Sequence, residues 1–132
     1  MSQLILDEHV AIPIVLPPLK KWISVGRIQD LRPGELILDD RVPQILRTLR
    51  KPTFVTIDNG FWRQSLCNPG YCLLCFDLRD DQQDHIPDLT RRLFHVADFQ
   101  TRSIRMGKVA RVRLHAVDYW QWRSPDLLRI AL

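Results

Sequence analysis

TFVTIDNGFW, residues 53–62, carries the clearest structural signal in this sequence. Apolar and β-branched residues run up to Asp58, and the Asn59-Gly60 pair then ends the run, which predicts a buried strand with a carboxylate at its C-terminal end. Ligand sites of α/β proteins lie beyond the carboxyl ends of such strands. The stretch therefore predicts an α/β fold and makes Asp58 the first candidate functional residue.

Two further acidic stretches occupy comparable positions. Leu4–Leu6 is a short apolar run that ends at Asp7 and Glu8, so we expect a first strand with acids at its C-terminal end. Asp39 and Asp40 precede apolar residues at helical spacing, which predicts an amphipathic helix capped by one of these aspartates. The apolar side of that helix consists of Val42, Ile45, Leu46 and Leu49. Three acidic positions could thus converge at one edge of a sheet.

The middle of the chain continues the same alternation of elements. Residues 71–76 form the most continuous apolar run, as expected of a central parallel strand, and a helix is predicted from about residue 87. Pro17 and Pro18 should interrupt any helix that follows the first strand. The order of strands and helices predicts an α/β chain with a mostly parallel sheet.

The C-terminal part is expected to be a β extension of this sheet. Residues 102–106 have a β-like pattern, and residues 109–117 alternate charged and apolar side chains. A continuous strand over 109–117 would place Arg111, Arg113 and His115 on one face. The extension is therefore predicted to carry a basic surface.

Length and composition indicate a single domain over residues 1–132. The chain is 45% hydrophobic and 26% charged, as in ordinary globular proteins, and is long enough to bury a core without disulfides. It contains no apolar run of about 18 residues and no N-terminal signal-peptide pattern. We therefore expect a cytoplasmic protein without a membrane partner.

Charge is distributed unevenly along the chain. Residues 1–90 carry 10 Lys and Arg against 12 Asp and Glu, whereas residues 91–132 carry 9 against 3. The first part thus has a net charge of −2 and the second of +6. An acidic and a basic part on one domain fit a carboxylate metal site beside a phosphate-binding surface. A solvated basic face is the alternative explanation.

The three cysteines are better explained by packing than by metal binding. Cys67, Cys72 and Cys75 have a C-x4-C-x2-C spacing that overlaps that of plant-type ferredoxins, but such a cluster needs a fourth thiolate. Cys72 and Cys75 lie in an apolar run, where a free cysteine behaves as a small buried hydrophobe.

A hard divalent cation would explain acids at several strand and helix ends. Mg²⁺ prefers oxygen ligands and keeps several of its waters, so a few carboxylates on rigid elements can hold it. The candidate ligands are Asp7, Asp40 and Asp58. Each has an alternative role, because Asp58 could form an Asx-turn while Asp7 and Asp40 could cap helices. Three further acids could join or replace them, namely Asp39, Glu35 and Asp77.

The order of these motifs resembles the PIN-domain-like family, in particular its small toxin-related branch. The resemblance spans nearly the whole chain, although each motif is short. The motifs that carry it are the run Leu4–Glu8, Asp40 before an amphipathic helix, the pattern Thr56-x-Asp58-x-x-Phe61, the strand at 71–77 and the basic strand at 108–113.

This resemblance implies a three-layer α/β sandwich and a Mg²⁺- or Mn²⁺-dependent endoribonuclease. Asp7, Asp40 and Asp58 match the acidic positions of the family and would ligate the ion, with a metal-bound water as the nucleophile. Arg111 and Arg113 would bind RNA backbone phosphate. In toxin–antitoxin pairs such proteins are held inactive by an antitoxin, so a protein partner of that kind and a homodimer are further expectations.

A second hypothesis belongs to a different functional class. The chain could be a catalytically degenerate PIN-like module that binds nucleic acid or a protein partner. Trp62, Trp120 and Trp122 would then offer a stacking or partner-binding surface. The alternative role for these tryptophans is core packing.

Overall fold

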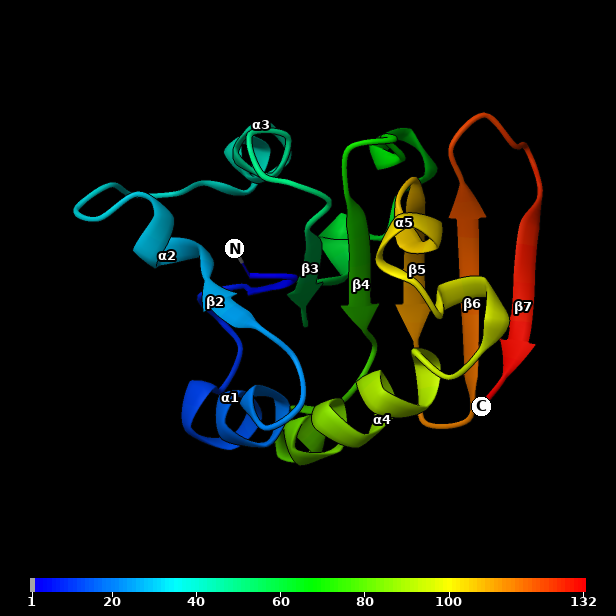
Figure 1. Ribbon diagram of the computed structural model, residues 1–132, viewed down its shortest axis with the longest axis horizontal. Helices are drawn as coiled ribbons and strands as arrows, with labels where there is room; N and C mark the ends of the chain where they lie inside the picture. Colours follow the sequence, from blue (N-terminus) through cyan, green and yellow to red (C-terminus); the bar gives the residue numbers. More distant parts are fainter. Residues whose placement is uncertain (1) are drawn as a thin grey trace.

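A computed structural model describes residues 2–132, and within them seven strands form one sheet. The strands are β1 (Leu4–Leu6), β2 (Val25–Arg27), β3 (Thr53–Thr56), β4 (Cys72–Phe76), β5 (Lys108–Val112), β6 (Ala116–Gln121) and β7 (Leu127–Ala131). Their order is β2-β1-β3-β4-β5-β6-β7, and Figure 1 shows β3 to β7 side by side. The pairs from β2 to β5 are parallel, whereas β6 and β7 are added antiparallel. The predicted α/β fold, with a mostly parallel sheet and a C-terminal β extension, is confirmed.

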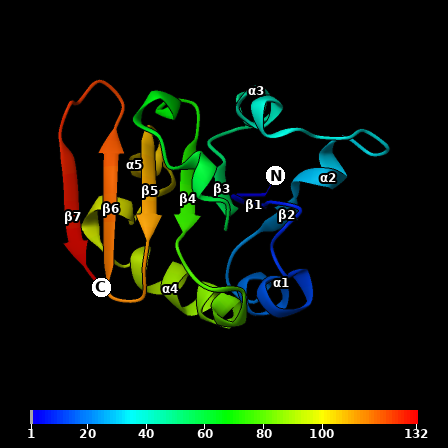
Figure 2. The same ribbon diagram turned by 180° about the vertical axis from the view of Figure 1, so that it is seen from behind.

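Helical segments cover both faces of this sheet. They are α1 (Ile12–Lys20), α2 (Ile28–Leu31), α3 (Val42–Leu46), α4 (Ile86–Leu93), α5 (Arg102–Arg105) and the 3₁₀ turns η1 (Asp39–Arg41), η2 (Asn59–Phe61), η3 (Gln64–Leu66), η4 (Asp80–His85) and η5 (Ala97–Phe99). α1 and α4 pack together over one face (Figures 1 and 2), while α3 and η2 cover the other. None of the described helices has the length and apolar character needed to cross a membrane.

Side chains alternate between the two faces, so the central strands are buried on both. Leu4 and Leu6 of β1 pack on the side of α1, and Ile5 between them packs on the side of α3. All five residues of β4 are buried, as expected of a central parallel strand. Cys72 and Cys75 are among them and are free thiols, so their predicted role as small buried hydrophobes is confirmed.

Pro17 and Pro18 do not interrupt the first helix, so that prediction is wrong. Both lie inside α1, which continues to Lys20. A proline in a helix interior removes one hydrogen bond and crowds the preceding turn, which costs about 3 kcal/mol. Val15 and Leu19 of α1 are fully buried, and α1 packs against α4. Tertiary burial therefore offsets the unfavourable local sequence.

The segment before β5 is helical, contrary to the β-like pattern of residues 102–106. Thr101 precedes α5, and its Oγ1 accepts a 3.1 Å hydrogen bond from Ile104 N. This capping interaction satisfies a backbone donor of the first turn and favours a helix start.

One continuous strand was expected over residues 109–117, and that prediction is wrong. The run is a hairpin. β5 ends at Val112, and β6 returns antiparallel from Ala116. Arg113 N donates a 2.9 Å hydrogen bond to Ala116 O across the turn. His115 lies in this turn, so it does not continue the strand face that carries the arginines.

The helix predicted after the Asp39-Asp40 pair is short. Both aspartates lie in η1, and α3 ends at Leu46 and not near Leu49. Neither aspartate caps α3 through its side chain, because the residue at the cap position is Arg41. The two carboxylates are therefore not used for the capping role that their position had suggested.

Candidate active site

Polar side chains follow four neighbouring strands along one edge of the sheet. In sheet order, Asp7 follows β1, Asp58 lies just beyond β3, Asp77 follows β4 and Arg113 follows β5. The chain reverses its progress across the sheet between β1 and β3, because β2 lies on the outer side of β1. In α/β proteins, ligands bind in the crevice at such a switch point, beyond the carboxyl ends of the strands. Asp7 and Asp58 flank this point.

Thr56, the last residue of β3, connects the two strand ends. Its Oγ1 donates a 2.7 Å hydrogen bond to Asp7 Oδ2 and accepts a 3.0 Å hydrogen bond from Asp58 N. Asp7 Oδ1 accepts a further hydrogen bond of 2.8 Å from Glu8 N. Thr56 is fully buried and Asp7 is only 4% exposed. Both carboxylate oxygens of Asp7 are therefore oriented by the protein.

Asp58 begins the turn that follows β3. Its Oδ1 accepts a 2.8 Å hydrogen bond from Gly60 N, which is the Asx-turn considered as its alternative role. The turn places Phe61 in the core, with its ring in an edge contact with Phe54 at a centroid distance of 5.4 Å. This hydrogen bond uses one of the two carboxylate oxygens, so the turn and a ligand role are compatible.

Asp39 is the third acid at this point. The pKa of its carboxyl group is raised first by loss of hydration, then by a hydrogen bond with Asp58 and by the charges of Asp58 and Asp7, although the side chain is exposed. The charge of His9 acts in the opposite direction. Asp40, the acid favoured from the sequence, follows Asp39 in η1, and both residues are exposed. The structure thus pairs Asp39 with Asp58 and links Asp58 to Asp7 through Thr56, and Asp40 follows Asp39 in the chain.

The acids also influence one another electrostatically. Burial raises the pKa of Asp7, although hydrogen bonds from Thr56 and from the Glu8 amide act against this shift. Carboxylates this close repel one another when all are ionised, and a proton or a cation between them removes the repulsion. The crevice therefore favours a positively charged occupant.

The donor chemistry of this crevice fits Mg²⁺ or Mn²⁺. Asp39 and Asp58 offer hard carboxylate oxygens whose mutual contact is favourable only with positive charge between them. Within residues 2–132, no three or more His, Cys, Asp or Glu side chains are already arranged as a ligand set. Mg²⁺ keeps several waters and needs few protein carboxylates, so a pair with a third acid nearby is chemically adequate.

The two other acids named from the sequence have different surroundings. Glu35 forms an ion pair with Arg41, with 3.0 Å between Oε2 and Nη1. Asp77 lies at the edge that carries the candidate site, where its Oδ1 accepts a 3.5 Å hydrogen bond from Asn59 Nδ2 and its Oδ2 lies 3.6 Å from Arg113 Nε. Asp77 therefore connects the acidic crevice to the basic strand.

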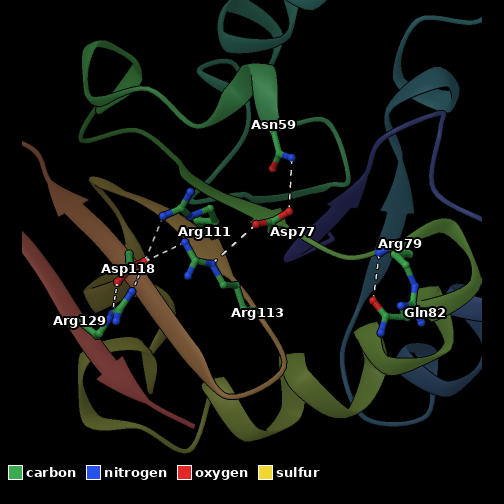
Figure 3. A network of polar contacts seen from close by, with 8 residues as sticks. All are labelled: Asn59, Asp77, Arg79, Gln82, Arg111, Arg113, Asp118 and Arg129. Carbon is green, nitrogen blue, oxygen red and sulfur yellow. Dashed lines mark hydrogen bonds and ion pairs between the residues drawn. The ribbon is translucent and has the colours of Figure 1, made fainter.

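Arg111 and Arg113 lie on the same sheet face and converge on one carboxylate (Figure 3). Asp118 Oδ2 lies 3.3 Å from Arg111 Nη2 and 3.6 Å from Arg113 Nη2. Arg129 Nε donates a 2.7 Å hydrogen bond to Asp118 Oδ1. Strand register produces this cluster, since Arg111 is opposite Asp118 and Asp118 is opposite Arg129. The hydrogen bond from Arg129, followed by that from Arg111, lowers the pKa of Asp118.

Two of the three tryptophans named from the sequence join this cluster. The rings of Trp62 and Trp120 are stacked, with centroids 4.1 Å apart and planes at 25°. The Arg111 guanidinium carbon lies 5.1 Å from the centroid of Trp62. Trp122 is instead 37% exposed and lies under the guanidinium of Arg123. Aromatic surface thus lies next to the guanidinium groups.

Sequence reasoning did not assign a role to Asp118 or Arg129. A lone acid inside the apolar run Ala116–Trp120 is a local signal of a buried charge that needs a partner. No such signal exists for Arg129, because its partner is eleven residues away and is reached only through the β6–β7 pairing. Thr56 was part of a motif, but its link between Asp7 and Asp58 depends on the parallel pairing of β1 with β3.

A scan against protein-family models, a search of curated proteins and a search of solved structures found no match to this chain. Function is therefore inferred from the geometry above and from the order of the motifs.

Proposed function

We propose that this chain is a metal-dependent endoribonuclease of the PIN-like type. The observation that carries the proposal is that Asp7 and Asp58 flank the switch point between β1 and β3 and that Asp39 interacts with Asp58. Carboxylates gathered at this position are suited to a divalent ion that acts on a phosphodiester. The basic cluster on β5 to β7 supplies the complementary charge for an RNA backbone.

Each side chain has a distinct role in this proposal. A bound Mg²⁺ or Mn²⁺ would supply an activated water and neutralise charge on the phosphate oxygens. Asp7, Asp39 and Asp58 would hold the ion, with Asp40 as the neighbouring acid that the sequence favours. Thr56 fixes the direction of Asp7, and the turn at Gly60 fixes that of Asp58. Arg111 and Arg113 would hold backbone phosphate.

Cleavage of RNA by the purified chain tests this function. Incubation with single-stranded and with structured RNA in Mn²⁺ should give products that disappear on addition of EDTA and in Asp58→Asn. Asp126→Asn is the matched control, because Asp126 is an exposed aspartate in the β6–β7 connection, at the opposite edge of the sheet. Cleavage that survives Asp58→Asn would rule out the proposed mechanism.

A binding module with degenerate acids is the second candidate function. It is favoured by the hydrogen bonds to both oxygens of Asp7, which give that carboxylate a structural role without any ion. The stacked Trp62–Trp120 pair beside Arg111 would serve such a module equally well. The two candidates differ in their response to metal, because Mn²⁺ would stabilise the folded chain only where the acids form an intact site.

A further inference from the structure

Three arginines share one carboxylate on the face of β5 to β7. The side chain of Asp118 is only 5% exposed, whereas those of Arg111, Arg113 and Arg129 are 27%, 39% and 63% exposed. The carboxylate thus lies beneath the guanidinium groups. Asp118 and the three arginines have a net charge of +2, which we assign to this arginine cluster, and Asp77 adds one negative charge at its edge, 3.6 Å from Arg113 Nε.

Unused hydrogen-bond donors remain in the arginine cluster. Each guanidinium has five N–H groups in a planar fork. The Nε atoms of Arg111 and Arg113 are buried, and neither has a hydrogen-bond acceptor among the described residues. The Asp77 oxygen nearest to Arg113 Nε lies at 3.6 Å, beyond hydrogen-bond distance. Because these Nε atoms are buried, an anion that arrives from solvent would meet the exposed parts of the three guanidinium side chains.

The arginine cluster is continuous with the acidic crevice. Asn59 follows Asp58 directly and donates to Asp77, which in turn faces Arg113 (Figure 3). A chain of phosphates that has one member at the crevice could therefore place a neighbouring one over β5. The stacked rings of Trp62 and Trp120 lie beside the cluster and are only partly buried. Base stacking on aromatic rings together with backbone contacts is how single strands are commonly bound.

We propose that Arg111, Arg113 and Arg129 form a phosphate-binding site for a single RNA strand that crosses β5 to β7 on its way to the acidic crevice. In the free chain, Asp118 lies within ion-pair distance of all three guanidinium groups. It is also an internal competitor for the phosphate, since both anions use the same donors. The identity of the strand as RNA rests on the proposed function, but its binding does not require cleavage.

Binding is measured without catalysis. The probe is a 5′-fluorescein-labelled single-stranded RNA of mixed sequence, titrated with the full chain in EDTA and followed by fluorescence anisotropy. Arg113→Gln and Arg129→Gln should each weaken binding several-fold, and the slope of log K against log salt should fall by about 0.7 for each lost phosphate contact. Arg91→Gln on α4, at the opposite sheet face, is the matched control and should retain wild-type affinity.

Asp118→Asn separates a binding role from a purely structural one. Removal of the competing charge raises the net charge of the cluster to +3, so RNA binding should tighten several-fold even where the melting temperature falls. If the cluster serves only to neutralise Asp118, the affinity for RNA should not rise in this variant. Unchanged affinity in Arg113→Gln and Arg129→Gln, or no gain in folded Asp118→Asn, overturns the proposal.

Failure of this proposal can be distinguished from failure of the proposed function. RNA that binds in EDTA through the arginines but is not cleaved in Mn²⁺ would support the phosphate site and reject the nuclease. RNA that is cleaved equally well by wild type, Arg113→Gln and Arg129→Gln would reject the site and keep the nuclease. If the wild-type chain does not bind the RNA at all, the site is rejected, and an acidic protein partner becomes the ligand to examine.

Discussion

At the scale of single residues, Thr56 is the side chain on which the geometry of the candidate site depends most directly. It is fully buried and hydrogen-bonds both to Asp7 Oδ2 and to Asp58 N, so it sets the relative position of two strand ends. A hydroxyl with two partners cannot be replaced by a methyl group without leaving buried polar atoms unsatisfied.

Replacement of Thr56 by valine should therefore weaken both folding and metal binding. The two lost hydrogen bonds predict a decrease of about 1–3 kcal/mol in the free energy of unfolding, measured by urea denaturation in EDTA. Thr90→Val is the control, because Thr90 is a buried threonine of α4 whose hydroxyl donates only to Ile86 O. If Thr56→Val responds to Mn²⁺ as the wild type does, the hydroxyl does not organise the site.

Asp39 provides a prediction about pH, because its pKa is raised in the folded chain by partial burial and by Asp58. An acid with a raised pKa binds protons more strongly when folded than when unfolded, so its ionisation destabilises the folded state as pH rises above its ordinary value of 3.8. In EDTA, Asp39→Asn should thus melt at a higher temperature than wild type at pH 7. The difference should vanish below about pH 4.

The same substitution should act in the opposite direction when metal is present. Asp39→Asn removes an anionic ligand, so the melting temperature of this variant should rise less than that of the wild type on addition of Mn²⁺. Asp40→Asn is the comparison, since Asp40 occupies the next position of η1. A greater loss of the Mn²⁺ response in Asp40→Asn would mean that Asp40, as predicted from the sequence, is the metal ligand in place of Asp39.

At the scale of elements, the start of β5 depends on the backbone of Gly107. Its φ is +89°, a conformation that side chains disfavour, and its N–H donates a 2.9 Å hydrogen bond to Tyr71 O. A Cβ atom here would lie 2.5 Å from Gln121 Nε2 and 3.3 Å from Trp122 Cβ. The path of the chain from α5 into the strand that carries Arg111 therefore requires glycine.

Gly107→Ala should lower the free energy of unfolding by about 1–3 kcal/mol. Gly34→Ala separates the cost of a positive φ from the cost of steric crowding. Gly34 also has a positive φ, of +78°, but no atom lies within 4 Å of the added Cβ. Chemical denaturation of both variants should show the larger loss for Gly107→Ala, and the difference measures the crowding against β6. Equal losses would mean that Gln121 moves aside at little cost.

At the scale of the whole molecule, metal should stabilise the entire fold. An ion that binds only the folded chain raises the free energy of unfolding by about 2.7 kcal/mol at a concentration of 100 times its Kd. Mn²⁺ titration of the wild type should therefore raise the melting temperature, while Asp58→Asn should not respond. A wild type that does not respond would favour the binding module with degenerate acids over the nuclease.

Local sequence was sufficient for much of the architecture. The runs that end at Asp7 and Asp58 and the apolar run of β4 were recognisable, because a buried strand needs consecutive apolar residues and a turn needs particular ones. The same local rules failed for α1, where burial of Val15 and Leu19 outweighs two internal prolines. They also failed at the β5–β6 hairpin, because charged and apolar residues continue to alternate through the turn.

The same distinction applies to the candidate site, part of which follows from local sequence and part of which does not. Residue type and periodicity are enough to place acids at the ends of β1 and β3 and basic residues on β5. The folded arrangement was needed to show that Asp39 interacts with Asp58 and that Thr56 joins two strands. It was also needed to show that Arg129 and Asp118 complete the arginine cluster. The physical reason is that such contacts depend on sheet order and strand register, which long-range packing sets and no local pattern encodes.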